Sequence, residues 1–128
     1  MRATTVLVLL IGLPISTAGC SKPLRATAIQ VGKSLNRDNS VSRHATSFQA
    51  SDTIYVSVLT EGRGAGTITA RCTYAGRLVS EPQKTVSYQG DAATEFHIQN
   101  SSGFPAGEYE VEILIDDKPH GSRKFRVE

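Results

Sequence analysis

Three histidines are the side chains whose type best suits them to bind a metal ion in this 128-residue chain. A zinc site needs about three or four nitrogen, sulfur or oxygen donors that converge on one point. His44, His97 and His120 are far apart in the sequence, and none has a second ligand at a useful spacing. His97 alternates with Phe96 and Ile98, which predicts that its side chain points outward. The sequence therefore predicts no metal site and places the three histidines on the surface or in loops.

Cys72 is the side chain best able to act as a nucleophile. It lies on the strand face shared by Ile68 and Ala70, where a free cysteine behaves as a small buried hydrophobe. A reactive thiol needs a neighbouring base or positive charge, and strand alternation points Arg71 away from it. We therefore expect a buried thiol. Two alternatives stay open, a reactive thiol and a disulfide between two copies in an oxidising compartment.

Three further patterns fall short of a site. Residues 63–66 are glycine-rich, but a phosphate-binding loop needs a longer glycine pattern that opens onto a helix, and here a strand follows. Asp116 and Asp117 supply two carboxylates, whereas calcium takes about six to eight oxygen ligands. No serine lies in a nucleophile-elbow pattern. The sequence therefore predicts turns at both places, no catalytic residue and no cofactor, and the protein is not expected to be an enzyme.

Charge and composition exclude several classes of protein. Fourteen Lys and Arg against twelve Asp and Glu give a formal net charge of +2, whereas a polybasic nucleic-acid binder concentrates an excess of Lys and Arg. A hydrophobic fraction of 39% argues against a disordered chain. Two cysteines, far apart, exclude a disulfide scaffold and a four-cysteine zinc site. We expect one folded domain that does not bind nucleic acid.

The N-terminus has the features of an export signal. Arg2 supplies one positive charge, and residues 3–19 carry none, with an apolar centre at residues 6–11. A helix needs roughly 20 apolar residues to cross the hydrocarbon core of a bilayer, so about a dozen is too short for a permanent span. A charged start, a short apolar centre and small residues at the end are typical of a cleaved signal.

This segment ends in Ser16-Thr17-Ala18-Gly19-Cys20. The pattern resembles the lipobox of bacterial lipoproteins, in which small residues precede a cysteine. Thr17 departs from that pattern, because its position most often holds leucine. The resemblance implies cleavage between Gly19 and Cys20 and a diacylglycerol on the Cys20 thiol. The alternative is ordinary signal cleavage after Ala18.

A lipidated Cys20 would divide the chain into a signal peptide (residues 1–19), a lipidated cysteine with a short tether (20–25) and a folded domain (26–128). Two or three acyl chains anchor a protein stably, at about 0.8 kcal/mol per buried methylene. Ser21 follows the cysteine, where the lipoprotein resemblance implies transport to the outer membrane of a Gram-negative cell, facing the periplasm. The expected location is the bacterial cell envelope, with the membrane as a partner through the lipid anchor.

The mature domain alternates apolar and polar residues at period two, which is typical of strands. In the clearest example, Tyr109, Val111, Ile113 and Ile115 alternate with Glu108, Glu110, Glu112 and Leu114. Strands are expected at residues 26–31, 54–59, 67–74, 77–79, 84–88, 92–98 and 108–115 and around Phe125 and Val127, with an edge strand near Val41 and a last turn over 116–121. About seven strands with turns about every 8 to 12 residues predict an all-β, antiparallel sandwich.

Residues 104–111 (Phe-Pro-Ala-Gly-Glu-Tyr-Glu-Val) resemble the turn and strand of immunoglobulin-like and fibronectin-like domains. In those domains a tyrosine just inside the sixth strand bonds its hydroxyl back to the preceding loop. The resemblance makes Tyr109 the candidate for this tyrosine corner and implies an immunoglobulin-like sandwich. The chain has no Trp, and Cys72 has no second domain cysteine, so it departs from antibody domains. The whole also resembles small bacterial envelope lipoproteins, and this resemblance supplies no activity.

The last hairpin carries a prediction of register. A slip of one residue would turn every side chain to the other face, so Val111 and Phe125 must share the inner face. Glu110 and Glu112 are then expected near Lys124 and Arg126 on the solvent side, as a ladder of opposite charges.

Two functions fit these features. The first is a non-catalytic protein-binding or structural module that engages another envelope protein. Its candidate surfaces are the loops at residues 32–47, 61–66 and 100–106, or an edge strand, which binds through backbone hydrogen bonds without a side-chain motif. The second is a periplasmic inhibitor or a ligand- or glycan-binding lipoprotein, with Tyr55, Tyr88 and Phe104 as the aromatic rings least committed to the core. An exposed aromatic pair would favour the second function, and a long unpaired edge strand the first.

Overall fold

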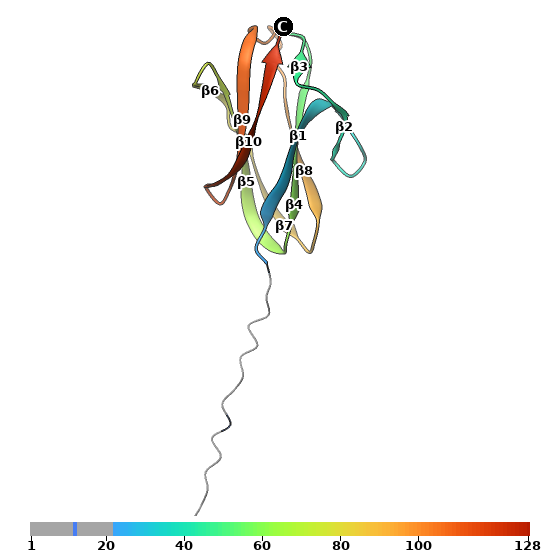
Figure 1. The fold of residues 1–128 in the computed structure, drawn as a ribbon, viewed down its shortest axis with the longest axis vertical. Coiled ribbons are helices and arrows are strands. Elements are labelled where there is room, and N and C mark those ends of the chain that lie inside the picture. The colour runs from blue at the N-terminus through green and yellow to red at the C-terminus, as the bar shows by residue number, and fades with distance from the viewer. Residues whose placement is uncertain (1–11, 13–21) are drawn as a thin grey trace, which may run out of the picture.

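Alternating apolar and polar residues build two β-sheets that pack face to face (Figure 1). The computed structural model describes Gly12 and residues 22–128, and within these it contains strands and turns but no helix. Cys20 and the expected cleavage site before it lie outside the described residues. The strands are β1 (Arg25–Leu35), β2 (Val41–His44), β3 (Ser47–Phe48), β4 (Ile54–Glu61), β5 (Gly64–Tyr74), β6 (Arg77–Ser80), β7 (Gln83–Tyr88), β8 (Ala92–Ile98), β9 (Gly107–Ile115) and β10 (Lys118–Val127).

One sheet has the strand order β2-β1-β4-β8, and the other has the order β3-β10-β9-β5-β6, with β7 also paired to β5. Every pair is antiparallel except β3 with β10, which is parallel. The predicted all-β sandwich is confirmed. The structure has more than the expected seven or so strands because short edge strands add to the count. β3 has two residues, too few for an alternating pattern, and β2, β6 and β7 each pair on one side only.

The inner faces of the two sheets meet in an apolar core. Its main contributors alternate along their strands as expected: Ile54, Val56 and Val58 on β4, Ile68, Ala70 and Cys72 on β5, and Tyr109, Val111, Ile113 and Ile115 on β9. Burial of apolar surface stabilises such a core by roughly 25 cal/mol per Å². The two-residue strand β3 contributes Phe48, which is fully buried and meets the Phe125 ring edge to face at 5.6 Å.

Two turns are shorter than the sequence indicated. The predicted last turn over residues 116–121 is wrong, because β10 already begins at Lys118. Asp116 and Asp117 have φ angles of 51° and 66°, which is the two-residue hairpin geometry that reverses a chain with the correct twist. The turn expected at residues 63–66 is likewise shorter, since β5 begins at Gly64.

The β9–β10 hairpin places Tyr109 opposite Phe125, so Val111 and Phe125 share the inner face as predicted. Glu110 has the expected neighbour Lys124, whereas Arg126 is paired with Glu108. Arg126 lies opposite Glu108 and its guanidinium is 3.1 Å from that carboxylate, while Lys124 lies opposite Glu110.

The expected position of Glu112 near these cations is wrong. Ser122 lies opposite Glu112, and the Glu112 carboxylate is instead 3.4 Å from Arg71 on β5. The interstrand charge ladder is therefore continued by a cation from the neighbouring strand.

The described chain enters β1 from a fixed position on the β4–β5 turn. Leu24 is 7% exposed, and the Arg63 backbone N–H donates to the Lys22 carbonyl at 2.9 Å. Gly62 has a φ of +95°, and a Cβ there would collide with the Pro23 carbonyl oxygen. Residues 22–24 are therefore held by the folded domain, and Arg25 already belongs to β1.

Candidate functional site

Two sheet edges border a groove at one end of the sandwich. β8 is the last strand of one sheet, and β6 is the last strand of the other. β6 and β7 run along β5 as one interrupted edge strand, broken at Glu81 and Pro82, where the Ala70 N–H donates to the Pro82 carbonyl at 3.0 Å. Neither β6 nor β8 pairs with a further strand of the described chain.

The edge groove has a volume of about 430 Å³ and combines aromatic, apolar and amide side chains. It is lined by Tyr74, Val79, Ser80, His97, Ile98, Gln99, Asn100, Phe104, Pro105 and Tyr109. One wall comes from β6 and the other from the end of β8, and the loop at residues 99–106 closes one side. An extended chain placed here would lie beside two strand edges at once.

Val79 lines the groove, and Leu78 is its neighbour on β6. Leu78 and Val79 on β6 are 56% and 53% exposed, and they are the large hydrophobic side chains that stand out as exposed in the described part of the chain. Single exposed apolar residues are common on protein surfaces, but neighbouring ones beside an unpaired strand are typical of a contact surface. Polar side chains at these two positions would allow the same edge strand to form. The exposure of Leu78 and Val79 is therefore not required by the fold.

Two tyrosine hydroxyls hold the loop at the rim of the groove. The Tyr109 hydroxyl donates to the Pro105 carbonyl at 2.7 Å, which is the bond that a tyrosine corner requires. The Tyr74 hydroxyl donates to the next carbonyl, that of Ala106, at 2.9 Å. Burial raises the pKa of Tyr109, and the nearby Tyr74 and Cys72 raise it further. Gly107 follows the loop with a φ of +139°, and a Cβ there would lie 3.0 Å from the Tyr74 ring.

A lysine protects the middle of the β8 edge. The Lys84 ammonium donates to the Glu95 carbonyl and lies 3.1 Å from the Glu95 carboxylate. His97 bonds the other carboxylate oxygen at 3.2 Å. Partial burial alone would raise the pKa of Glu95, but these hydrogen bonds and positive charges outweigh it, so its pKa is lowered. Lysine on an edge strand discourages unwanted pairing, which leaves the end of β8 beside the groove as its more accessible part.

Cys72 lies beneath the groove, in the core. It lines a cavity of about 10 Å³ together with Phe96, Ile98 and Phe125. Cys72 is 2% exposed, and its thiol is free within the part of the chain that the structure describes. Burial raises the pKa of its thiol to about 11, so the thiol stays protonated near neutral pH.

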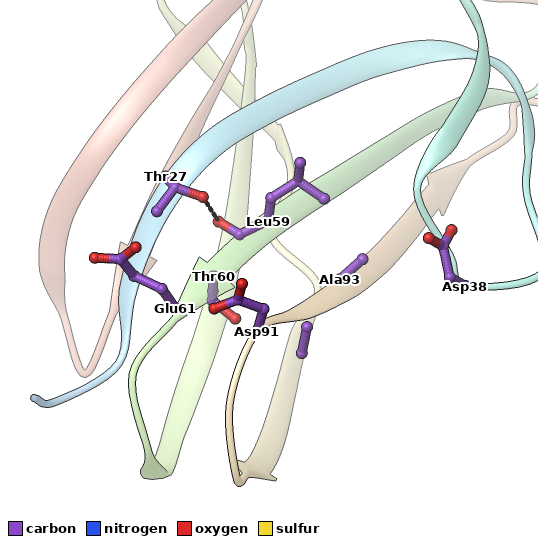
Figure 2. Close-up of a pocket in the computed structure, with 8 residues that line it drawn as sticks. Thr27, Asp38, Leu59, Thr60, Glu61, Asp91 and Ala93 are labelled. Carbon is purple, nitrogen blue, oxygen red and sulfur yellow. Dashed lines mark hydrogen bonds between the residues drawn. The ribbon is translucent and has the colours of Figure 1, made fainter. Parts of the chain in front are cut away.

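A second hollow, of about 480 Å³, lies on the outer face of the four-stranded sheet (Figure 2). Three carboxylates border it, and Figure 2 shows Asp38 standing apart from Glu61 and Asp91. The Asp38 carboxylate accepts hydrogen bonds from the backbone N–H and the hydroxyl of Ser40, and these bonds lower the pKa of this carboxyl. Glu61 is paired with Arg25. The hollow is therefore a weaker candidate than the edge groove.

The three loops proposed from the sequence do not form one site. Asp38 from residues 32–47 and Glu61 from residues 61–66 border the same acidic hollow. Asn100, Phe104 and Pro105 from residues 100–106 line the edge groove, at the other end of the sandwich (Figure 1). The contribution of β6 to that groove was not foreseen. Its signal was the pair Leu78 and Val79, which broke the alternation expected of a half-buried strand.

The histidines are separate in space as well as in sequence. His44 and His97 are exposed, and the partly buried His120 accepts the Ala26 N–H through Nδ1 at 3.4 Å. No cluster of three or more His, Cys, Asp or Glu suited to a metal ion occurs among the residues that the structure describes. Over the same residues, no helix has the length and apolar character needed to cross a bilayer.

Comparison with known proteins identifies the fold. No protein-family model matches the chain, and no curated protein matches it in sequence. An immunoglobulin-like protein from Pseudomonas aeruginosa superposes with a TM-score of 0.57 at 13% identity, covering 86% of this chain and all of that one. A β-glucosidase from Listeria innocua gives a TM-score of 0.51 at 9% identity over 82% of this chain, which spans only 16% of the enzyme. These likenesses show an immunoglobulin-like β-sandwich.

Proposed function

We propose that this protein is a membrane-anchored lipoprotein of the bacterial envelope whose sandwich binds an extended segment of another envelope protein without catalysis. The observation that carries the binding role is the edge groove, which the exposed Val79 lines beside the unpaired edges of β6 and β8. A peptide added to a strand edge gains affinity from backbone hydrogen bonds and specificity from pockets for alternate side chains. The aromatic floor of the groove, with Tyr74 and Phe104, supplies such a pocket.

The alternative of a glycan-binding lipoprotein has less support. Stacking against a sugar needs an exposed aromatic face, as a pair of rings or a single platform. Of the eight aromatic side chains, all within the described residues, four are buried and four are partly buried. Tyr55 and His97 lie with ring centroids 6.0 Å apart on the outer face of the sheet, but only His97 is exposed.

The binding role is tested by photocrosslinking in the native envelope. A photoreactive amino acid replaces Val79 in the groove or Arg43 on β2, an exposed edge residue of the opposite side of the fold. We expect a single crosslinked protein from position 79 and none from position 43. Val79→Glu should then abolish copurification of that protein, and Arg43→Glu should leave it intact. Crosslinks of equal yield from both positions would contradict a dedicated groove.

The anchor is tested separately with the two cysteines. Cys20→Ala should leave the precursor uncut and without lipid, so that the protein keeps the mass of the signal peptide. Cys72→Ala is the matched control, because it removes a thiol that is buried in the domain, and it should be processed and lipidated normally. If the Cys20→Ala protein keeps its mature mass and its membrane association, the lipoprotein assignment is wrong.

A further inference from the structure

We propose that the anchor end of the sandwich lies directly against the lipid head groups, so that the edge groove is held at the far end, away from the membrane. The anchor end is formed by residues 22–25 together with the β4–β5, β7–β8 and β9–β10 turns (Figure 1). This inference rests on the proposed lipid anchor at Cys20 and adds an orientation to it.

The first step is the length of chain between the anchor and the domain. Ser21 is the single residue between Cys20 and Lys22. At about 3.5 Å per residue, the Cys20 Cα cannot lie more than ~7 Å from that of Lys22. Lys22 is itself fixed, because its carbonyl accepts the Arg63 N–H at 2.9 Å. A tether this short allows the domain little freedom to tumble over the membrane.

The second step is the rigidity of the attachment. Leu24 is buried, and Arg25 forms an ion pair with Glu61 across the first rung of β1 with β4. Gly62 brings the β4–β5 turn so close to Pro23 that a side chain would not fit between them. The chain therefore leaves the domain in one direction, past the turn, and not along a flexible arm.

The third step is the chemistry of the anchor end. Lys22, Arg25, Lys118 and His120 surround a hollow of about 410 Å³ beside Leu24 and Ile115. Asp116 also lines it, and its Oδ1 accepts the Thr67 N–H at 2.9 Å. Glu61, Asp91 and Asp117 also lie at this end. The anchor end therefore presents positive and negative side chains to a membrane that contains zwitterionic and anionic lipids. The cations gain from anionic head groups, while the short tether supplies the orientation.

The fourth step is the position of the groove. β9 runs from Gly107, beside the Tyr74 ring, to Ile115, which lines the hollow at the anchor end. Its nine residues span ~30 Å at about 3.4 Å per residue. The edge groove is therefore raised above the head groups by the length of the sandwich, within reach of a partner in the periplasmic space.

Tryptophan fluorescence can test this orientation, because the chain contains no native Trp. Lys118→Trp places a probe at the anchor end, and Asn100→Trp places one at the groove; both side chains are exposed. The lipidated full-length variants are purified from membranes and reconstituted in vesicles of phosphatidylethanolamine and phosphatidylglycerol that carry a nitroxide on some head groups. We expect the Lys118→Trp protein to lose most of its fluorescence and the Asn100→Trp protein to retain it.

Flotation of the same vesicles separates the two proposals. Protein that floats with the vesicles and shows equal quenching at both positions would overturn the orientation and leave the anchor intact. Protein that does not float would overturn both. A flexible Gly-Ser insert of about 20 residues after Ser21 reaches ~25 Å and should reduce quenching of the Lys118→Trp probe. Unchanged quenching in the insert variant would show that the short tether does not set the orientation.

Discussion

Tyr74 and Tyr109 donate their hydroxyls to two consecutive carbonyls, those of Ala106 and Pro105, at 2.9 Å and 2.7 Å. Their ring centroids are 4.7 Å apart, so the two side chains form one unit that joins β5 to β9. The loop that they hold forms the rim of the edge groove. The same contacts therefore stabilise the fold and fix the shape of the proposed binding surface.

Removal of either hydroxyl should weaken the domain. A hydrogen bond of this kind contributes about 1 kcal/mol, and the contribution is larger where the bond is partly buried, as it is for Tyr109. We expect Tyr109→Phe to lower the free energy of unfolding by about 1–2 kcal/mol and Tyr74→Phe, which is more exposed, by about 0.5–1 kcal/mol. Urea denaturation measures both. Tyr55→Phe is the control, since the described residues offer its hydroxyl no partner; a loss as large as that of Tyr109→Phe would contradict the assigned bond.

The tyrosine at position 109 was predictable and its partner was not. Period-two alternation and the Phe104-Pro105 turn are local patterns, and they suffice to place Tyr109 on the inner face near the preceding loop. The bond from Tyr74 to Ala106 depends on β5 lying beside β9, and strand order is not written in any local pattern. The groove depends in the same way on β6 and β8 ending two different sheets.

Chain reversal was also harder to predict than strand faces. Asp116 and Asp117 take up a left-handed conformation that aspartate tolerates but does not require, so the sequence allowed a longer turn than the one observed. The burial of Leu24, just before β1, could not be predicted from the local sequence either. This leucine is buried next to Lys22 and Pro23, whose carbonyls lie close to Gly62 of the β4–β5 turn, a contact between segments far apart in sequence.

Cys72 should be chemically inert in the folded protein. Its thiol is 2% exposed, and burial raises its pKa to about 11, so both access and the thiolate fraction are low. We expect no reaction with a thiol reagent at pH ~8 in the mature lipoprotein, and full reaction after denaturation. Val79→Cys, exposed beside the groove, is the positive control and should react at once. Rapid labelling of native Cys72, or a dimer on a non-reducing gel, would instead support the reactive or disulfide-forming alternative.

Two buried threonines on the neighbouring strands β4 and β8 should respond in opposite ways to the same substitution. Thr60 is 2% exposed and its hydroxyl has no partner among the described residues, whereas the Thr94 hydroxyl is 2.7 Å from that of Tyr88. Valine keeps the shape and removes the hydroxyl. Thr60→Val should therefore raise the free energy of unfolding by about 1 kcal/mol, and Thr94→Val should lower it by about 1 kcal/mol. Thermal or urea unfolding of both variants decides the point; a loss in Thr60→Val would show that its hydroxyl is satisfied in solution.

Glu95 should make the stability of the β8 edge depend on pH. Its pKa lies below the ordinary value of 4.5: partial burial acts to raise it, but the hydrogen bonds and charges of His97 and Lys84 outweigh burial. Because the folded pKa is below the unfolded one, the stabilisation is fully present above about pH 4.5 and is lost as the pH falls through the folded pKa.

Glu95→Gln should thus be less stable than the native chain at neutral pH, by about 0.5–1 kcal/mol, and the difference should shrink in acid. Lys84→Met removes one donor to the carboxylate and should narrow the same pH dependence. Urea titrations from neutral to acidic pH measure the three proteins together. The proposed role of this carboxylate would be wrong if the difference in the free energy of unfolding between the native chain and Glu95→Gln stayed constant down to pH ~2, well below the ordinary pKa of a glutamate.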